Sequence, residues 1–291
     1  MRGFVLALAV TLAAVAATNA GAQSGEWVDV ERREVLLGGR TADDARRDAL
    51  YGALAEAVRR VTGVQVQGSV VATRSDSAGR IVDHYAEAVR LDASGRATEW
   101  RIVSEGWQTE RPRGGESRAV YVLKLRVRVE REHGTRDPAF TVSLSANAET
   151  YVVRGTDPAA SDEVIATIET SLDASITLVS IVDDSVFVLA PNALMAGVRT
   201  TARRRCEIPG ADLRVMGLHF RVWLPAGGPS RTEFLAVVAT RRPVALPSVP
   251  GTGATRDTGT LTLAEFNQWL VGLPMDERAV AQVSLTVRRR P

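Results

Sequence analysis

The sequence predicts a β-rich fold in two parts. The first is an α+β domain, an antiparallel sheet with one long helix, and the second is a mainly-β sandwich with one C-terminal helix. Three observations predict this. A long run after Thr41 places apolar residues at helical spacing, later segments alternate apolar and polar residues, and turn-forming residues separate these segments. The 291-residue chain is long enough for two domains of ordinary size.

The first residues have the three parts of a secretory signal peptide. Arg2 is the only charge before an apolar run that begins at Phe4, and Ala20-Gly21-Ala22 supplies small residues before a cut at Gln23. The apolar run is shorter than the roughly 20 residues that a membrane-spanning helix needs. A lipid anchor requires a cysteine just after the cut, where Gln23 stands. We therefore expect residues 1–22 to be removed and the protein to be periplasmic.

The long helix is predicted over residues 41–62, after a strand at 27–37 and a turn at Gly38-Gly39. Thr41 and Asp44 have the spacing of a capping box, and Gly63 suits the left-handed position that ends many helices. Charged residues are expected on one face of the helix. The apolar residues recur at steps of three and four, which predicts one buried stripe on the other face, formed by Ala45, Ala49, Leu50, Ala53, Leu54, Ala57, Val58 and Val61.

The strands of the first domain are predicted at 64–73, 81–91, 97–110 and 119–131. The last of these has the clearest pattern in the chain, because apolar and charged residues alternate from Leu123 to Glu130. One face is predicted to be buried, with Tyr121, Leu123, Leu125, Val127 and Val129 on it.

Polar turn formers at 133–138 mark the predicted boundary between a domain at 23–132 and a second domain at 138–291. Beyond it, turns such as Asp183-Asp184 separate short β-like segments, a spacing typical of a β-sandwich. A surface loop is expected at 243–259, and a capping box at Thr262 and Glu265 predicts one more helix. We expect strands at 140–145, 150–154, 164–172, 176–182, 186–189, 213–224, 233–240 and 281–287.

The first domain resembles the N-terminal domain of the flagellar assembly protein T family and small outer-membrane lipoproteins of similar fold. The residues that carry the resemblance are Gly39 to Thr41, Ala45-Arg46, Asp48-Ala49-Leu50, Gly63-Val64 and Gly106, within residues 26–132. The resemblance implies a periplasmic or outer-membrane location and a role in assembling envelope structures.

The second domain resembles the domain-of-unknown-function family 4384 over about residues 138–246. The matching motifs come in a characteristic order along the chain: Tyr151 with Gly155, Leu189-Ala190-Pro191-Asn192, Ile208-Pro209, Leu224-Pro225-Ala226-Gly227 and Glu233-Phe234-Leu235-Ala236-Val237. An insertion at 157–161 departs from the pattern. This family has no established activity, so the resemblance implies none for this chain.

No catalytic apparatus is recognisable, and we expect no catalytic, cofactor-binding or metal-binding residues. The histidines His84, His133 and His219 lack metal-ligand spacing. The sequence contains neither the Gly-x-Ser-x-Gly nucleophile elbow of serine hydrolases nor a phosphate-binding loop. The single cysteine, Cys206, cannot form an intramolecular disulfide. We interpret it as a buried or incidental cysteine at a strand edge, although the preceding arginines could lower its pKa.

Three further groups have both a structural and a functional interpretation. We interpret Asp183-Asp184 as turn residues rather than a carboxylate pair, and the acidic loop from Asp157 to Glu163 as solvated rather than calcium-binding. Most of the tryptophans at 100, 107, 223 and 269 are expected to anchor the core, the alternative being a sugar or peptide platform.

The net charge of +2 and the mixing of acids with arginines argue against nucleic-acid binding. Our leading hypothesis is a non-enzymatic envelope protein that binds other envelope or outer-membrane proteins. A surface assembly is one candidate partner. We do not expect an integral membrane protein. The alternatives are a periplasmic binder of a small ligand or glycan and a hydrolase of unfamiliar design. A cleft with Trp or Tyr and convergent polar groups favours the ligand binder.

We predict that the exported protein begins at Gln23, because the small residues at 20 and 22 suit the signal peptidase. Mass spectrometry of the periplasmic fraction should find an N-terminal peptide that starts at Gln23 or at its cyclised form. An intact Met1 in the membrane pellet contradicts this prediction.

Overall fold

The computed structural model describes residues 25–36, 41–63, 90, 94–111, 113, 115–155, 158–192, 194–195, 197–224, 230–247 and 260–290. Several expectations lie outside these residues: the signal peptide at 1–22, the turn at 38–39, the strand at 64–73, all of the strand at 81–91 except residue 90, and most of the loop at 243–259. The described residues form a mostly β structure with three sheets, which confirms the β-rich class.

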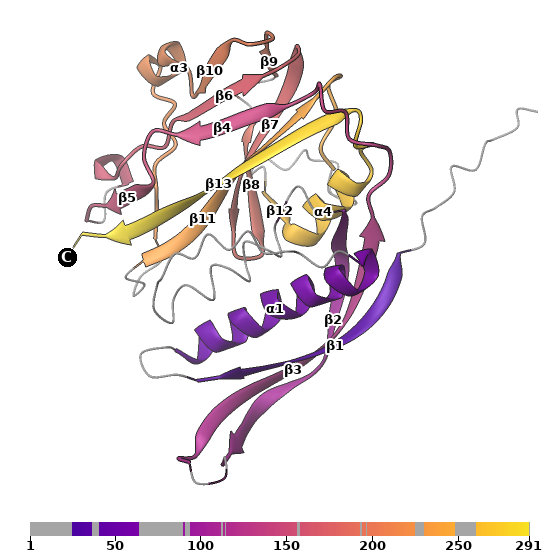
Figure 1. Ribbon diagram of the computed structural model, residues 1–291. Coiled ribbons are helices and arrows are strands. Elements are labelled where there is room, and N and C mark those ends of the chain that lie inside the picture. Colours follow the sequence, from indigo (N-terminus) through magenta and orange to yellow (C-terminus); the bar gives the residue numbers. More distant parts are fainter. Residues whose placement is uncertain are drawn as a thin grey trace, which may run out of the picture.

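A three-stranded antiparallel sheet lies at the bottom of Figure 1, in the order β1-β3-β2. Its strands are β1 (Glu26–Val35), β2 (Gly95–Glu110) and β3 (Arg118–Arg131). The predicted buried face of β3 is confirmed, since Tyr121, Leu123, Leu125, Val127 and Val129 are all buried. The helix α1 (Ala42–Thr62) lies across this face, because the alternation gives the sheet one apolar side to cover.

The ends of α1 are formed by the predicted residues. The Thr41 side chain accepts a hydrogen bond from the Asp44 backbone, and the Asp44 carboxylate accepts one from the Thr41 backbone. Gly63 has φ 67°, the left-handed conformation that glycine adopts without a steric penalty.

The burial of α1 is wider than the single stripe predicted from the sequence. Ala49 and Ala53 are fully buried, and Tyr51, on the opposite side of the helix, is buried as well. Figure 1 shows α1 between the three-stranded sheet and a second, larger sheet. A helix that packs on two sides needs apolar residues on both of them, and the stripe predicts only one of the two contacts.

The larger sheet has the order β12-β8-β7-β11-β13-β5, with β9 also paired to β7. Its central strand β11 is buried on both faces, which explains its continuous apolar run. Phe234, Ala236 and Val238 face the core that includes α1, whereas Leu235 and Val237 face the opposite core. The strands are β5 (Thr150–Val153), β7 (Ala174–Val182), β8 (Ser185–Ala190), β9 (Val198–Thr200), β11 (Ser230–Thr240), β12 (Thr260–Thr262) and β13 (Arg278–Arg289).

A small antiparallel sheet covers the other face of the large sheet, in the order β10-β6-β4. Its strands are β4 (Val142–Ala146), β6 (Ala166–Thr170) and β10 (Arg205–Ile208). Phe140, Ile168 and Ile208 pack with Leu178 and Leu235 of the large sheet in the second core. Two sheets packed face to face over an apolar core form the sandwich arrangement.

The capping box at Thr262 and Glu265 is confirmed, and α4 (Leu263–Val271) follows it. The strand predicted at 213–224 is wrong. Residues Ala211–Val215 form the short helix α3, and Gly217 has φ 93°, so the chain turns instead of extending. Asp212 favours a helical first turn, and a left-handed glycine breaks strand geometry, which the alternating pattern does not reveal.

The first core crosses the predicted boundary at 133–138. It joins Ala53 and Leu54 of α1 to Ile181 of β7, Phe234 of β11 and Phe266 of α4. The division into two domains stays a prediction, and the boundary is not a gap in apolar packing.

We predict that Ala53→Leu destabilises the protein by about 1–3 kcal/mol, because Ala53 is fully buried where α1 packs closely. Urea denaturation measures the free energy of unfolding. Ala42→Leu is the matched control, since Ala42 is an exposed alanine of the same helix. Equal stability of the two variants contradicts the close packing of α1.

Candidate functional site

A groove of about 450 Å³ opens on the face of the large sheet that also carries the small sheet. Its apolar base comes from β8, β11 and β13, including Leu189, Leu235 and Leu285. The segment at 220–223, which precedes β11, forms one wall. The volume lies within the range that ligand pockets occupy, and a sheet buried on both faces makes the base rigid.

Two exposed aromatic side chains line this groove. Trp223 is 58% exposed and Phe187 is 42% exposed, although both are large apolar residues. Exposing such side chains to water costs free energy that burial under a partner would recover. The aromatic pair is therefore the strongest sign of a binding surface in this part of the molecule.

An ion pair lies beside the aromatic side chains. Arg231 and Glu233 stand on the same face of β11, and the Arg231 guanidinium donates to the Glu233 carboxylate. The same guanidinium donates to the backbone oxygen of Trp223 at 2.9 Å and lies 5.9 Å from the centre of its ring. These contacts hold the wall of the groove against its base.

Burial raises the pKa of the Glu233 carboxyl above its ordinary value even though Arg231 opposes the shift, and Asp183 adds to it. Asp183 begins the turn between β7 and β8 with φ 50°, and its side chain lines the same groove. The groove thus combines apolar contact area with a few polar groups that could orient a bound molecule.

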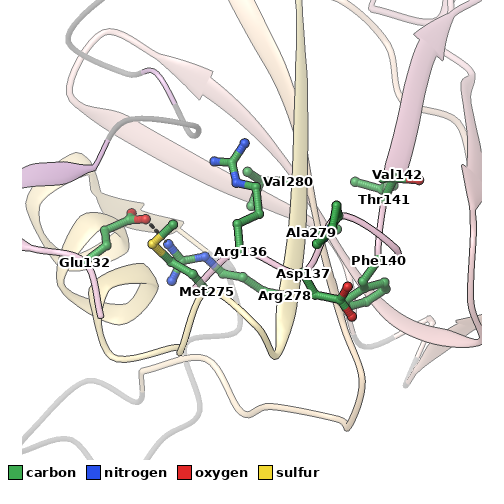
Figure 2. A pocket seen from close by; sticks show the side chains of 11 residues that line it. Glu132, Arg136, Asp137, Phe140, Thr141, Val142, Met275, Arg278, Ala279 and Val280 are labelled. Carbon is green, nitrogen blue, oxygen red and sulfur yellow. Dashed lines mark ion pairs between the residues drawn. The ribbon is translucent and has the colours of Figure 1, made fainter. Parts of the chain in front are cut away.

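A second, smaller cavity of about 190 Å³ lies at the predicted domain boundary. Figure 2 shows Glu132 and Arg278 joined by an ion pair beside it, with Met275 next to them. Arg96 of β2 donates to the other oxygen of the Glu132 carboxylate at 2.5 Å. The three side chains are at most 3% exposed, so two positive charges and one negative charge are buried together.

The contacts of these side chains indicate a structural role. Arg278 also donates to the backbone oxygens of Leu270 and Leu273, at the end of α4. Burial lowers the pKa of Arg278 to about 10, although Glu132 opposes the shift. The cluster connects β2, the residue that follows β3, and β13, which come from both sides of the predicted boundary.

The histidines and the cysteine are not brought together among the described residues. His219 contacts Glu163 at 2.9 Å, the backbone oxygen of His133 accepts from Met275, and His84 lies outside the described residues. Burial raises the pKa of the Cys206 thiol, which is the opposite of an activated nucleophile. Cys206 lies on the edge strand β10, as its interpretation as an incidental thiol predicts.

The acidic groups at 157–163 have structural contacts where they are described. Asp162 accepts from the Val152 backbone and pairs with Arg154, and Ser161 accepts from the Arg154 backbone. Asp157 lies outside the described residues. Across the described part of the chain, no group of three or more acidic, histidine or cysteine side chains is arranged to hold a metal ion. None of the described helices is both long and apolar enough to span a membrane.

The four tryptophans at 100, 107, 223 and 269 divide into two pairs. Trp269 is buried and Trp100 packs against the first core, as predicted. Trp107 is 43% exposed beside Tyr121, and Trp223 is the exposed residue of the groove, so neither anchors the core. The sequence pattern does not reveal the exposure of Trp223, because it predicts a buried strand at 213–224. The one signal for it is the following turn-forming stretch, Pro225 to Pro229, which places Trp223 near a loop.

A scan against protein-family models found no match for this chain, and a search among curated proteins found none either. The two family resemblances therefore stay predictions.

We predict that Glu132→Gln destabilises the protein by about 3–5 kcal/mol, because the variant removes the negative charge that two buried guanidinium groups share. Thermal and urea denaturation measure the change. The control is Glu99→Gln, which removes an exposed ion pair with Arg101 and should change stability by less than about 1 kcal/mol. Similar losses in both variants contradict the structural role of the buried cluster.

Proposed function

We propose that this chain is a non-enzymatic binding module of the bacterial cell envelope, exported to the periplasm, which holds another envelope component in the groove at Trp223. One observation carries the proposal: two exposed aromatic side chains, Trp223 and Phe187, line a groove of about 450 Å³ on the large sheet. Large aromatic residues supply much of the binding energy at protein interfaces.

The proposal includes the finer domain assignment. Residues 23–132 would form the α+β domain that resembles the flagellar assembly protein T family, and residues 138–291 the sandwich that resembles family 4384. Support comes from the predicted helix caps and the alternation in β3. In this assignment the first part contributes α1 to the core beneath the large sheet, and the second part carries the groove.

The proposal excludes catalysis. His219 and Glu163 pair with each other outside the lining of the groove, and the Cys206 thiol has a raised pKa. Asp184 belongs to the turn between β7 and β8. A catalytic nucleophile needs a base within hydrogen-bond reach, and Cys206 instead donates to the backbone oxygen of Glu207.

A second candidate is a periplasmic protein that binds a glycan or small ligand in the same groove. The observation that favours it is the exposed Trp223 ring beside the polar pair Arg231 and Glu233, since sugars combine an apolar face with hydroxyl groups. Titration calorimetry with cell-wall oligosaccharides distinguishes the two candidates, because only a sugar binder gives heat that Trp223→Ala removes.

We predict that a photo-crosslinking residue at position 223 captures an envelope protein in living cells, because the side chain there faces the groove. The same residue at position 107 is the control, since Trp107 is a similarly exposed tryptophan on β2. With the captured protein purified, Trp223→Ala should weaken binding by about 30-fold, the effect of losing a hot-spot side chain.

Two results would contradict the proposed function. Equal capture from positions 223 and 107 contradicts a binding role for the groove. Loss of the cellular function in a folded His219→Ala or Cys206→Ala variant contradicts the non-enzymatic part of the proposal.

A further inference from the structure

The wall of the groove at 220–223 is an extended segment with a strand-like neighbour on one side. It runs antiparallel to the segment 162–164, which leads into β6, and Arg221 lies at the centre of the bridge between them. The backbone oxygen of Phe220 and the backbone N–H of Val222 each form a hydrogen bond to this neighbouring segment. One edge of the wall is therefore occupied by backbone pairing.

The other edge of the wall faces the groove. Backbone groups of successive residues in a strand point to opposite edges, so those of Arg221 and Trp223 point away from 162–164. Arg231, whose side chain lines the groove, donates to the Trp223 backbone oxygen at 2.9 Å, which identifies this edge as the one toward the groove. Among the hydrogen bonds formed by the described residues, none involves the backbone N–H or C=O of Arg221. The wall thus presents a free backbone donor and a free backbone acceptor to the groove.

The charged side chains that line the groove already have partners. Glu233 pairs with Arg231, and Asp183 pairs with Arg47 of α1. The side chain of Arg221 donates to a backbone oxygen. The lining contains two acids and two arginines, so a charged occupant would lose its hydration without gaining an unpaired counter-charge. Charge complementarity therefore favours a neutral occupant.

We propose that the groove receives an extended, uncharged segment of a partner protein, which adds as a strand to the wall at Arg221 and places apolar side chains against Phe187 and Trp223. The inference rests on the proposed function and names how the partner is recognised. In strand addition, backbone hydrogen bonds hold the incoming segment, and pockets accept its alternate side chains.

The base of the groove suits the side chains of such a strand. Side chains of a strand alternate between two faces, so every second residue of the added segment would face the large sheet. The sheet is apolar there, with Leu189, Leu235 and Leu285, and Phe187 is still 42% exposed. A volume of about 450 Å³ accommodates a few side chains of this size. A glycan could contact the aromatic rings, but it lacks the regularly spaced backbone N–H and C=O groups with which a strand edge pairs.

The test uses the full chain and a blocked six-residue peptide that alternates valine with threonine, and titration calorimetry measures its binding. A set of the same peptide carries one N-methyl group at each residue in turn, which removes a single backbone donor. We expect binding to weaken about tenfold or more where the methylated nitrogen faces the wall, and by less than about threefold where it points outward. The losses should therefore alternate along the peptide, as the pairing of a strand requires.

Variants of the protein and of the peptide test the side-chain contacts. Phe187→Ala should weaken binding of the unmodified peptide about tenfold, because its ring supplies apolar contact area. Leu194→Ala is the matched control and should leave binding unchanged, since Leu194 is an exposed apolar residue outside the lining of the groove. Thermal denaturation checks that both variants are folded. Replacing one valine of the peptide by lysine or by glutamate should weaken binding in both cases, because neither charge finds an unpaired partner.

The outcomes separate this inference from the proposed function. Losses that do not depend on the methylated position overturn strand addition, and so does the absence of any peptide binding. In both cases, selective capture of an envelope protein from position 223 would still support the proposed function. Tighter binding of the lysine or the glutamate peptide than of the valine peptide overturns the uncharged partner. Peptide binding that is unchanged in both Phe187→Ala and Trp223→Ala, together with equal capture from positions 223 and 107, overturns both proposals.

Discussion

The carboxylate of Glu132 holds together parts of the chain that are far apart in sequence. It pairs with Arg96 of β2 and Arg278 of β13, and all three side chains are almost completely buried. Burying charges is costly, so such a cluster is stable only when every partner is in place. Backbone oxygens at the end of α4 complete the contacts of Arg278. The position of β2 relative to β13 depends on this cluster of three charged side chains.

With that arrangement fixed, α1 becomes a shared core element. Its alanines pack against the β1-β3-β2 sheet, while Tyr51 faces the turn between β7 and β8. The same core includes alternate residues of β11, whose other face belongs to the sandwich core. The large sheet is therefore packed on both faces. A rigid sheet of this kind suits a binding site, because little conformational entropy is lost when a partner docks.

The groove combines an apolar base with an exposed tryptophan and charged side chains. Leu235 and Leu285 continue the apolar face of the sheet, but the wall at 220–223 leaves Trp223 more than half exposed. Arg231 fixes that wall by donating to the Trp223 backbone and pairing with Glu233. The turn at Asp183 then brings negative charge to one end. These features come together from four segments of the chain, and no single motif contains them.

The sequence by itself determined the local structures. Thr41, Asp44 and Gly63 specify the ends of α1, and the alternation from Tyr121 to Val129 specifies a half-buried strand, because caps and periodicity act over a few residues. Only the tertiary structure decided that α1 is covered on two sides, that the predicted strand at 213–224 begins inside a short helix, and that Trp223 is exposed. These outcomes depend on which surfaces meet across long sequence separations, and such contacts leave no periodic trace in the chain.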